Sequence, residues 1–289
     1  MVQTFQHESY IGPCLEGILN QHTDFPFEIL LGEDGSSDGT REICQKYAAR
    51  FPDKIRLFLH HPENKIKVQH MNTGNFNALY NFYSAKGKYI AFCEGDDIWV
   101  DSGKLQKQVD LLEAQPDLSL CFHSYIEVNK DLQPLPDEQV LTQPKQHLSP
   151  KELQQLNFHP LLSTLCFRNT LNGKLPEEMV QILNVDSFLI SLLGNFGSGH
   201  FLSSIRPSYY RRHDSGIWSH RNKNRKLKSK ILTYSKIAEF YQRNEKAELF
   251  NYFKSKVRLM QKMLFIYYLK HGRILEAIGC LYRIREHVR

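Results

Sequence analysis

The sequence contains little that would mark a secreted or membrane-spanning protein. Only 6 of its 289 residues are cysteines and none forms a C-x-x-C pair, so we expect neither a disulfide framework nor a zinc site. No apolar run approaches the ~18 residues that a membrane span requires, and no apolar N-terminal stretch resembles a signal peptide. We therefore expect a soluble or peripheral protein in a reducing compartment, with buried free thiols.

The sequence does have the means to build a globular core, and its charge is unevenly placed. An apolar content of 41% over 289 residues is enough for one large domain, or for one domain with an appendage. From Arg221 onward, 18 Lys and Arg stand against 5 Asp and Glu, whereas residues 1–220 hold 19 against 26. We infer an acidic globular domain over residues 1–220 and a basic helical extension over residues 221–289.

The first 220 residues alternate between strand-like and helix-like segments, which predicts an α/β fold with a mostly parallel sheet. The expected strands are 1–4, 28–32, 55–60, 88–93, 118–128 and 161–167, followed by a final pair that ends near residue 213. The helices expected from apolar spacing are 10–21, 41–50, 75–86, one around 105–112, and 186–193. Asp38 is expected to cap the second of these helices.

Two pairs of acidic residues follow the second and fourth predicted strands. These pairs are Glu33 with Asp34 and Asp96 with Asp97. Ligands of open parallel sheets bind at the carboxyl ends of the strands. Adjacent carboxylates there are kept together most easily by a cation or a hydrogen-bond donor, and Mg²⁺ or Mn²⁺ suits one or two carboxylates plus phosphate oxygens. An isolated Asp-Asp pair is more often a solvated turn, so the neighbouring residues decide between these interpretations.

The neighbouring segments form an ordered set of motifs. They read Gln3-Thr4-Phe5-Gln6-His7, Glu33-Asp34-Gly35-Ser36-Ser37-Asp38-Gly39-Thr40, Ala85-Lys86-Gly87-Lys88-Tyr89-Ile90, Glu94-Gly95-Asp96-Asp97-Ile98-Trp99 and Tyr210-Arg211-Arg212-His213-Asp214-Ser215-Gly216-Ile217-Trp218. This set resembles the family 2 glycosyltransferases, closely over residues 1 to about 110 and more weakly to Trp218. The resemblance implies a GT-A fold, with a nucleotide-binding half over about 1–115 and an acceptor half over about 116–220. It also implies that a sugar is transferred from a UDP- or dTDP-sugar to an acceptor hydroxyl, with inversion. The transferred group is expected to be a hexosyl or an N-acetylhexosaminyl group.

The resemblance implies that the first acidic pair lies in the pocket for the donor's base. Asp34, with Glu33 beside it, would accept the N3–H of a uracil or thymine ring. Thr4 and Phe5 would line this pocket, and the Phe5 ring would offer a stacking surface. Core packing is an equally good explanation of Phe5.

The resemblance implies that the second acidic pair serves the reacting end of the donor. Asp96 would face the ribose or sugar, and Asp97 would bind the Mg²⁺ or Mn²⁺ that neutralises charge on the departing diphosphate. His213 would complete the metal shell or contact a phosphate. Asp186 is the candidate base that deprotonates the acceptor hydroxyl, although capping of its own helix explains this residue equally well.

The sequence departs from the family pattern at several positions. Val185 stands where an acidic residue is common, and Asn77-Ala78-Leu79 replaces a tripeptide that contains an arginine. Lys65 or Lys67 is then a candidate phosphate contact. These departures leave open a non-catalytic module that binds a sugar nucleotide or a glycan. A nucleotidyltransferase would need a Gly-rich, basic phosphate loop near the first strand, and residues 1–12 contain none.

The expected partners follow from the same resemblance and from the basic extension. We expect a nucleotide-diphosphate sugar donor and a glycan or lipid-linked acceptor, in surface polysaccharide synthesis in the cytoplasm. The extension is expected to pack on the catalytic domain, with peripheral contact to an anionic membrane surface as a second role. No nucleic-acid recognition motif accompanies its charge, so we expect no nucleic-acid partner.

Overall fold

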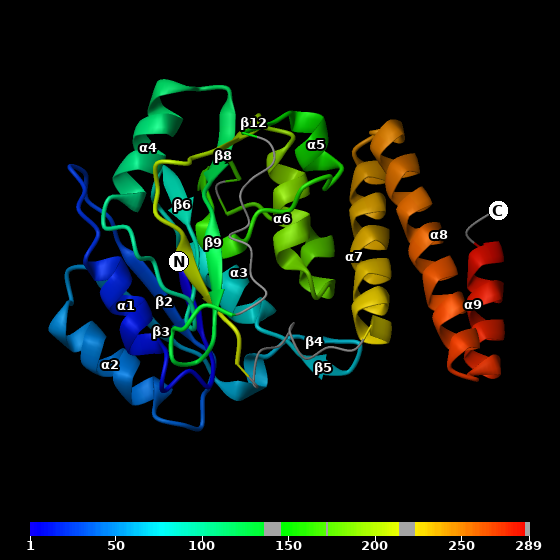
Figure 1. Cartoon of the computed structure of the whole chain (residues 1–289), viewed down its shortest axis with the longest axis horizontal. Coiled ribbons are helices and arrows are strands. Elements are labelled where there is room, and N and C mark those ends of the chain that lie inside the picture. Colours follow the sequence, from blue (N-terminus) through cyan, green and yellow to red (C-terminus); the bar gives the residue numbers. More distant parts are fainter. Residues whose placement is uncertain (136–145, 172, 214–222, 287–289) are drawn as a thin grey trace. The chain divides into compact units, whose positions relative to one another are not determined.

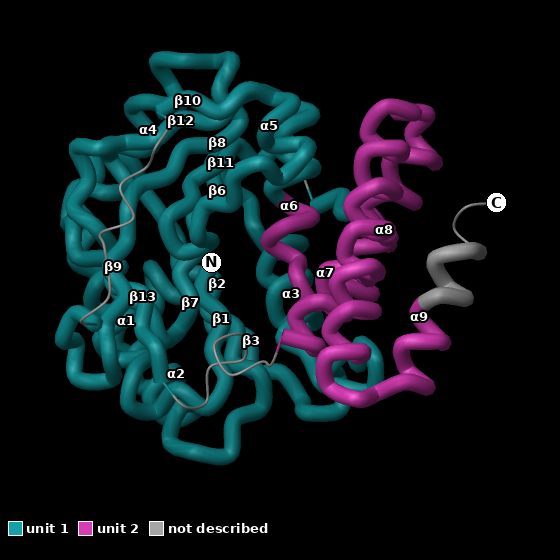
Figure 2. The backbone as a smooth tube through the Cα atoms, turned by 45° about the vertical axis from the view of Figure 1, so that its right-hand side comes forward, with its two compact units in different colours: residues 1–175, 190–213 teal, residues 176–189, 214–289 magenta. Residues whose placement is uncertain are grey.

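The computed structural model describes residues 1–135, 146–171, 173–213 and 223–286, and only the backbone of 281–286. The chain forms two compact units, residues 1–175 with 190–213 and residues 176–189 with 214–289 (Figure 2). The boundary predicted near residue 220 falls outside the described residues. All six cysteines are buried free thiols, as the sequence predicted. Among the described helices, none combines the length and the apolar character needed to cross a bilayer.

Unit 1 contains a parallel sheet with the strand order β3-β2-β1-β7. Its strands are β1 (Val2–Thr4), β2 (Ile29–Glu33), β3 (Ile55–Leu59) and β7 (Cys93–Glu94). The short strand β1 lies inside the sheet, where Val2 pairs with Leu31 on one side and with Cys93 on the other. Because these strands are parallel neighbours, the segments that follow β1, β2 and β7 all leave the sheet at one edge.

Three helices pack against this sheet: α1 (Ile11–Leu19), α2 (Thr40–Arg50) and α3 (Asn75–Ser84). Figure 1 shows α1 and α2 beside β2 and β3. Helix α3 is held by buried amides, since Asn77 Nδ2 donates to the Gly32 carbonyl (2.8 Å) and Asn81 Nδ2 donates to the Val2 carbonyl (2.9 Å). A Cβ atom at Gly32 would lie 1.7 Å from Asn77 Oδ1, so only glycine allows this close approach.

The structure divides two of the strands that the sequence predicted as single. Residues 88–93 form β6 (Tyr89–Ala91) and part of β7, which belong to different sheets. Residues 118–128 form β8 (Leu118–Phe122) and β9 (Tyr125–Val128), which also belong to different sheets. Residues 89–93 are all apolar or aromatic, so composition does not mark the change of sheet there. In the second run the change of sheet falls on the polar pair His123 and Ser124, which the prediction of a single strand passed over.

The second sheet of unit 1 has the order β10-β12-β8-β11-β6 and mixes parallel and antiparallel pairs. Its other strands are β10 (His147–Leu148), β11 (Cys166–Arg168) and β12 (Ser198–Phe201). Strand β13 (Ser208–Arg211) pairs in parallel with β9. The remaining elements are β4 (Lys67–Val68), β5 (Met71–Asn72), α4 (Lys104–Ala114), α5 (Pro150–Gln154), and the 3-10 helices η1 (Pro62–Asn64) and η2 (Leu162–Thr164).

Unit 2 is helical, as the sequence predicted for the extension. It contains the 3-10 helix η3 (Glu177–Gln181), the first part of α6 (Val185–Leu193), α7 (Lys223–Arg243), α8 (Ala247–Lys270) and α9 (Ile274–Glu286). Leu227, Leu264 and Tyr268 belong to the buried core that joins α7, α8 and α9. Arg243 donates two hydrogen bonds, of 3.1 and 2.9 Å, to the buried Glu178 carboxylate, which ties η3 to α7.

Candidate active site

The segments that follow β1 and β2 are joined by hydrogen bonds at the sheet edge. The backbone N–H of Gln6 donates to Ser36 Oγ (3.0 Å), and that of His7 donates to Thr40 Oγ1 (2.8 Å). Asp38 does not occupy the predicted N-cap, because Gly39 takes that position. Asp38 instead accepts the N–H of Thr40 (3.1 Å) and the N–H of Glu8 (3.1 Å). The turn between β2 and α2 thereby fixes the path of residues 5–8.

The segment after β7 reaches the same edge. The backbone N–H of Gly95 donates to the Gln3 carbonyl (2.9 Å), which continues the pairing of β1 with β7. The two acidic pairs therefore follow strands that flank β1. This register confirms the prediction from the sequence that the two acidic pairs lie at one edge of the sheet.

The first acidic pair combines an engaged carboxylate with one that is partly free. Glu33 is fully buried and accepts from Arg41 Nε and from the N–H of Ser36. Asp34 is 3% exposed, and among the described residues its Oδ1 has no hydrogen-bond partner. Burial raises the pKa of Asp34 to about 6, although the nearby Lys65 ammonium opposes this shift.

Phe5 and Lys65 complete this part of the site. Phe5 is 39% exposed, so its interpretation as a core residue is wrong. Lys65 Nζ lies 3.2 Å from the centroid of the Phe5 ring and 3.5 Å from Asp34 Oδ2. Thr4 is buried, and its Oγ1 has no partner in the described part of the chain. The Phe5 ring, the Asp34 carboxylate and the Lys65 ammonium thus form one small cluster.

The two members of the second acidic pair have different surroundings. Asp97 is fully buried; its Oδ2 accepts from the Ser163 hydroxyl and its Oδ1 accepts from the N–H of Arg211 (3.2 Å). Burial, and then the charge of Asp96, raise the pKa of Asp97. Asp96 is only half-buried. Burial alone would raise its pKa, but the hydrogen bond to His213 and the charge of His7 hold the pKa of Asp96 below its ordinary value.

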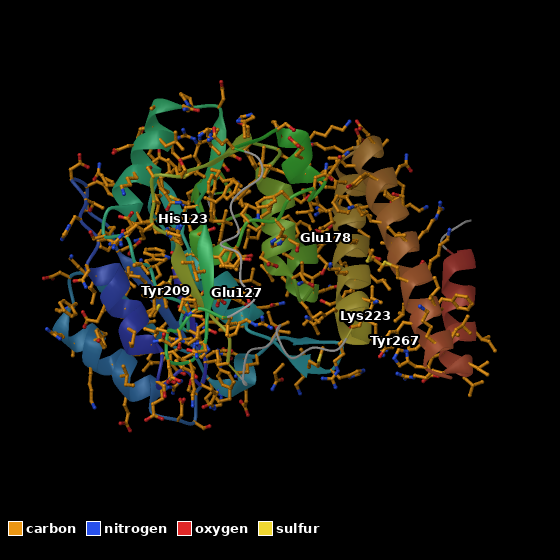
Figure 3. All side chains as sticks on the ribbon, viewed as in Figure 1. His123, Glu127, Glu178, Tyr209, Lys223 and Tyr267 are labelled. Carbon is orange, nitrogen blue, oxygen red and sulfur yellow. The ribbon has the colours of Figure 1, made fainter. Side chains whose placement is uncertain are left out.

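His213 lies next to Asp96, although it is 117 positions away in the sequence. Its Nε2 is 2.9 Å from Asp96 Oδ2. Strand β13 brings it there, because Ile98 and Tyr209 exchange two backbone hydrogen bonds, of 3.0 and 2.9 Å. Figure 3 labels Tyr209 on β13 and Glu127 on the paired strand β9. Residues 214–218 of the same motif lie outside the described residues.

Two side chains that the sequence analysis gave no role also belong to this site. His7 Nε2 lies 3.8 Å from Asp96 Oδ2, so His7, Asp96 and His213 form a group of potential metal ligands. Arg211 is 4% exposed and lies 4.5 Å from the Tyr10 ring centroid, and its Nε and Nη1 have no partner among the described residues. The sequence pointed to them only through their positions, because His7 follows Phe5 by two residues and Arg211 precedes His213 by two.

The candidate base Asp186 lies in the other compact unit. It is the second residue of α6 and is half-buried. Its catalytic role stays a prediction, and so does the substrate-binding role of Glu33, whose carboxylate oxygens already accept hydrogen bonds within the protein.

A model of glycosyl transferase family 2 matches residues 1–173, which include both acidic pairs. The chain belongs to glycosyl transferase family 2. A similar protein, the putative glycosyltransferase EpsH of Bacillus subtilis, is 25% identical over 258 residues, which cover 86% of this chain and 70% of EpsH. The uncharacterized protein Rv1520 of Mycobacterium tuberculosis is 31% identical over 215 residues, which cover 74% of this chain. The match spans 58% of the length of Rv1520.

Among solved structures, residues 1–349 of Staphylococcus aureus TarS, in complex with UDP-GlcNAc, share the fold. The TM-score is 0.60 at 15% sequence identity, and the match covers 99% of this chain and 90% of that one. At this identity the likeness concerns the fold alone. It confirms the GT-A class predicted from the sequence, including the C-terminal helices.

Proposed function

We propose that this family 2 glycosyltransferase transfers a sugar from a UDP- or dTDP-sugar to an acceptor hydroxyl, with inversion at the sugar carbon. The observation that carries the proposal is the position of Asp34 and Asp96 on either side of β1 at one sheet edge. Among the described residues, Asp34 Oδ1 has no hydrogen-bond partner and can accept a hydrogen bond from a base. Asp96 lies beside the imidazoles of His7 and His213, which together can bind a cation that carries the diphosphate. The likeness to TarS with UDP-GlcNAc supports a UDP-sugar as the donor.

The base end of the donor is assigned to Asp34 and Phe5. Asp34 Oδ1, which has no partner in the described part of the chain, is a suitable acceptor for the N3–H of uracil or thymine. Cytosine has no hydrogen at that position. The exposed Phe5 ring offers a stacking surface. Lys65 now covers this ring, so we propose that it moves aside or contacts the edge of the base when the donor binds.

The cation is assigned to Asp96 and His213, and the described residues fit it. The two ligand atoms are 2.9 Å apart, whereas both Asp97 oxygens accept hydrogen bonds from the protein. Mg²⁺ or Mn²⁺ would neutralise charge on the leaving diphosphate. The buried Arg211 guanidinium, whose Nε and Nη1 have no partner among the described residues, is proposed to add positive charge beside the same phosphates.

The acceptor end is assigned to Asp186, which would accept the proton of the attacking hydroxyl. One base is sufficient for a single displacement with inversion, because no covalent intermediate has to be resolved. Asp186→Asn keeps the shape of the side chain and removes the base. Transfer should fall while UDP affinity stays the same; equal transfer by the variant would exclude this role.

Nucleotide titration by calorimetry tests the proposed donor. UDP should bind in the presence of Mn²⁺ and CDP should bind at least about tenfold more weakly, because a carboxylate then faces a ring nitrogen that accepts rather than donates. Asp34→Ala should remove this preference for UDP, whereas the exposed Asp53→Asn should keep it. Equal affinities of the wild-type protein for UDP and CDP would refute the assignment of Asp34.

We further propose a glycan or lipid-linked acceptor in surface polysaccharide synthesis, reached at the inner face of the membrane. The support is a row of exposed apolar side chains on α8, which is rich in Lys and Arg, and on α9. Their exposed fractions are Leu259 52%, Met263 38%, Ile266 50%, Leu269 49%, Ile274 62%, Leu275 83% and Ile278 44%. Apolar side chains among Lys and Arg are typical of helices that lie on anionic lipid.

Vesicle sedimentation tests this contact. Vesicles that contain phosphatidylglycerol should retain the protein, and vesicles of phosphatidylcholine alone should retain much less. The double variant Leu275→Ser, Ile278→Ser should weaken retention, whereas Leu59→Ser, which removes an exposed leucine of unit 1, should not. Retention that is indifferent to lipid charge and to the double variant would refute the membrane role.

A further inference from the structure

Three side chains from three separate segments converge near the carboxyl end of β1. They are His7, Asp96 and His213, whose candidate ligand atoms all lie within 4.8 Å of one another. We propose that His7 is a third protein ligand, so that the site binds a transition-metal ion such as Mn²⁺ or Co²⁺ before the nucleotide arrives and favours it over Mg²⁺. This inference rests on the proposed function, which needs only Asp96 and His213, and it extends that function to a preformed and selective site.

The His7 ring is held in place from several sides. Its backbone N–H donates to Thr40 Oγ1 (2.8 Å), and its carbonyl accepts from the N–H groups of Tyr10 and Ile11 (2.9 Å each). A Cβ atom at Gly95 would lie 2.8 Å from His7 Nδ1, so the ring packs directly against the backbone that leads to Asp96. The side chain is 16% exposed. His7 therefore loses little freedom when it binds an ion.

The contact between His7 and Asp96 is too long to be a hydrogen bond. The distance from Nε2 to Oδ2 is 3.8 Å, whereas N–H···O bonds end near 3.2 Å. Two atoms that share an ion at about 2.1 Å lie about 3.0 Å apart when cis and about 4.2 Å apart when trans. The distances of 3.8 Å from His7 and 2.9 Å from His213 to the same oxygen fall close to that range. A shared ion would satisfy all three side chains with small adjustments.

His213 is equally well fixed. Its side chain is 4% exposed, and its ring centroid lies 4.7 Å from that of Tyr10 and 6.0 Å from that of His7. Contacts within the protein thus hold both imidazoles beside Asp96. A site that needs only small adjustments can bind its ion without help from the donor phosphates.

The chemistry of this ligand set determines the preferred ion. Imidazole nitrogen is a good ligand for transition metals and a poor one for Mg²⁺, which prefers oxygen and keeps its water molecules. A site with one carboxylate and two imidazoles should therefore bind Co²⁺ and Mn²⁺ more tightly than Mg²⁺. If His7 only donated a hydrogen bond to phosphate, it would add nothing to this preference in the nucleotide-free protein.

Electron paramagnetic resonance of Mn²⁺ with the nucleotide-free chain tests the proposal. The wild-type protein should bind Mn²⁺, and pulsed measurements should detect two coordinated nitrogens. His7→Gln should weaken binding by about tenfold or more and leave one nitrogen. The control His22→Gln, at an exposed histidine, should change neither. Unchanged affinity and two coordinated nitrogens in folded His7→Gln would overturn the proposal.

A second variant keeps the test decisive if His7→Gln folds poorly. His7→Asp offers oxygen in place of nitrogen, so competition titrations should show the preference for Mn²⁺ over Mg²⁺ reduced relative to the wild-type protein; an unchanged preference would contradict the proposal. UDP titration at saturating Mn²⁺ separates this inference from the proposed function. UDP binding with no role for His7 would refute only the inference, whereas Mn²⁺ binding through His7 without UDP binding would refute only the function.

Discussion

The hydroxyl of Ser163 donates to the buried carboxylate of Asp97, 66 positions earlier in the chain. The same hydroxyl accepts the N–H of Glu94 (3.2 Å). One side chain of η2 thus fixes both ends of the turn that carries Asp96. Asp97 therefore has a structural role, because its hydrogen bond to Ser163 fixes the turn to the protein interior. Asp96 instead faces the imidazoles of His7 and His213.

Ser163→Ala should destabilise the protein. The change leaves a buried carboxylate oxygen and a backbone N–H without their partner, which should lower the free energy of unfolding by about 1 to 3 kcal/mol. Urea denaturation measures this loss. The control Ser255→Ala, at an exposed helical serine, should change stability by less than about 0.5 kcal/mol. Equal stability of Ser163→Ala and the wild-type protein would show that this contact contributes nothing.

Asp96→Asn and Asp97→Asn should have different effects on metal-dependent binding. Asp96→Asn removes the carboxylate next to His213, so the gain in UDP affinity on adding Mn²⁺ should shrink by about tenfold or more. Asp97→Asn should lower the stability of the fold and keep most of that gain in the folded protein. Calorimetric titration of UDP with and without Mn²⁺ measures both. Loss of the gain in Asp97→Asn alone would restore the original assignment of the metal to Asp97.

The sequence predicted the sheet edge well because its signals are local. Apolar β2 ends directly on Glu33 and Asp34, and the turn residues that follow it are contiguous in the sequence. The parallel arrangement then brings the second acidic pair to the same edge, as expected from the alternation of strands and helices.

The different roles of Asp96 and Asp97 could not be predicted from local signals of this kind. Asp96 and Asp97 are adjacent and chemically identical, and their difference comes from groups that are 66 and 114 positions away from Asp97. The place of His7 in the site was unpredictable for the same reason. Its approach to Asp96 depends on the pairing of β1 with β7, which no local pattern reveals.

Binding of a UDP-sugar should depend on pH through Asp34. Because burial raises the pKa of Asp34 to about 6, its carboxylate is protonated below that pH and cannot accept the N3–H without first losing a proton. Affinity should therefore increase as the pH rises from 5 to 7. A UDP-sugar is a better probe than UDP here, because its diphosphate has no terminal phosphate group that titrates near pH 6. Asp34→Ala should flatten this part of the profile, and a profile that is unchanged in the variant would assign the dependence to another group.

Lys104 should make stability depend on pH in the alkaline range. It is fully buried at the start of α4, where Nζ donates to Gln108 Oε1 (2.7 Å) and lies 3.8 Å from the Trp99 ring centroid. Burial lowers the pKa of Lys104 to about 8, from an ordinary value of 10.5. Between these two values the unfolded chain binds more protons than the folded protein, so the contribution of Lys104 to stability increases with pH.

Lys104→Met removes this titration while keeping a side chain of similar length. Urea denaturation at pH 8 and at pH 9.5 should show the wild-type protein gaining roughly 2 kcal/mol relative to the variant. Below about pH 7 the difference between the two should be nearly constant, since Lys104 is then charged in both the folded and the unfolded state. Lys86→Met, at an exposed lysine, should follow the wild-type curve at every pH. If Lys104→Met also follows it, the buried ammonium does not titrate in this range, and the burial of Lys104 must be compensated by its contacts with Gln108 and Trp99.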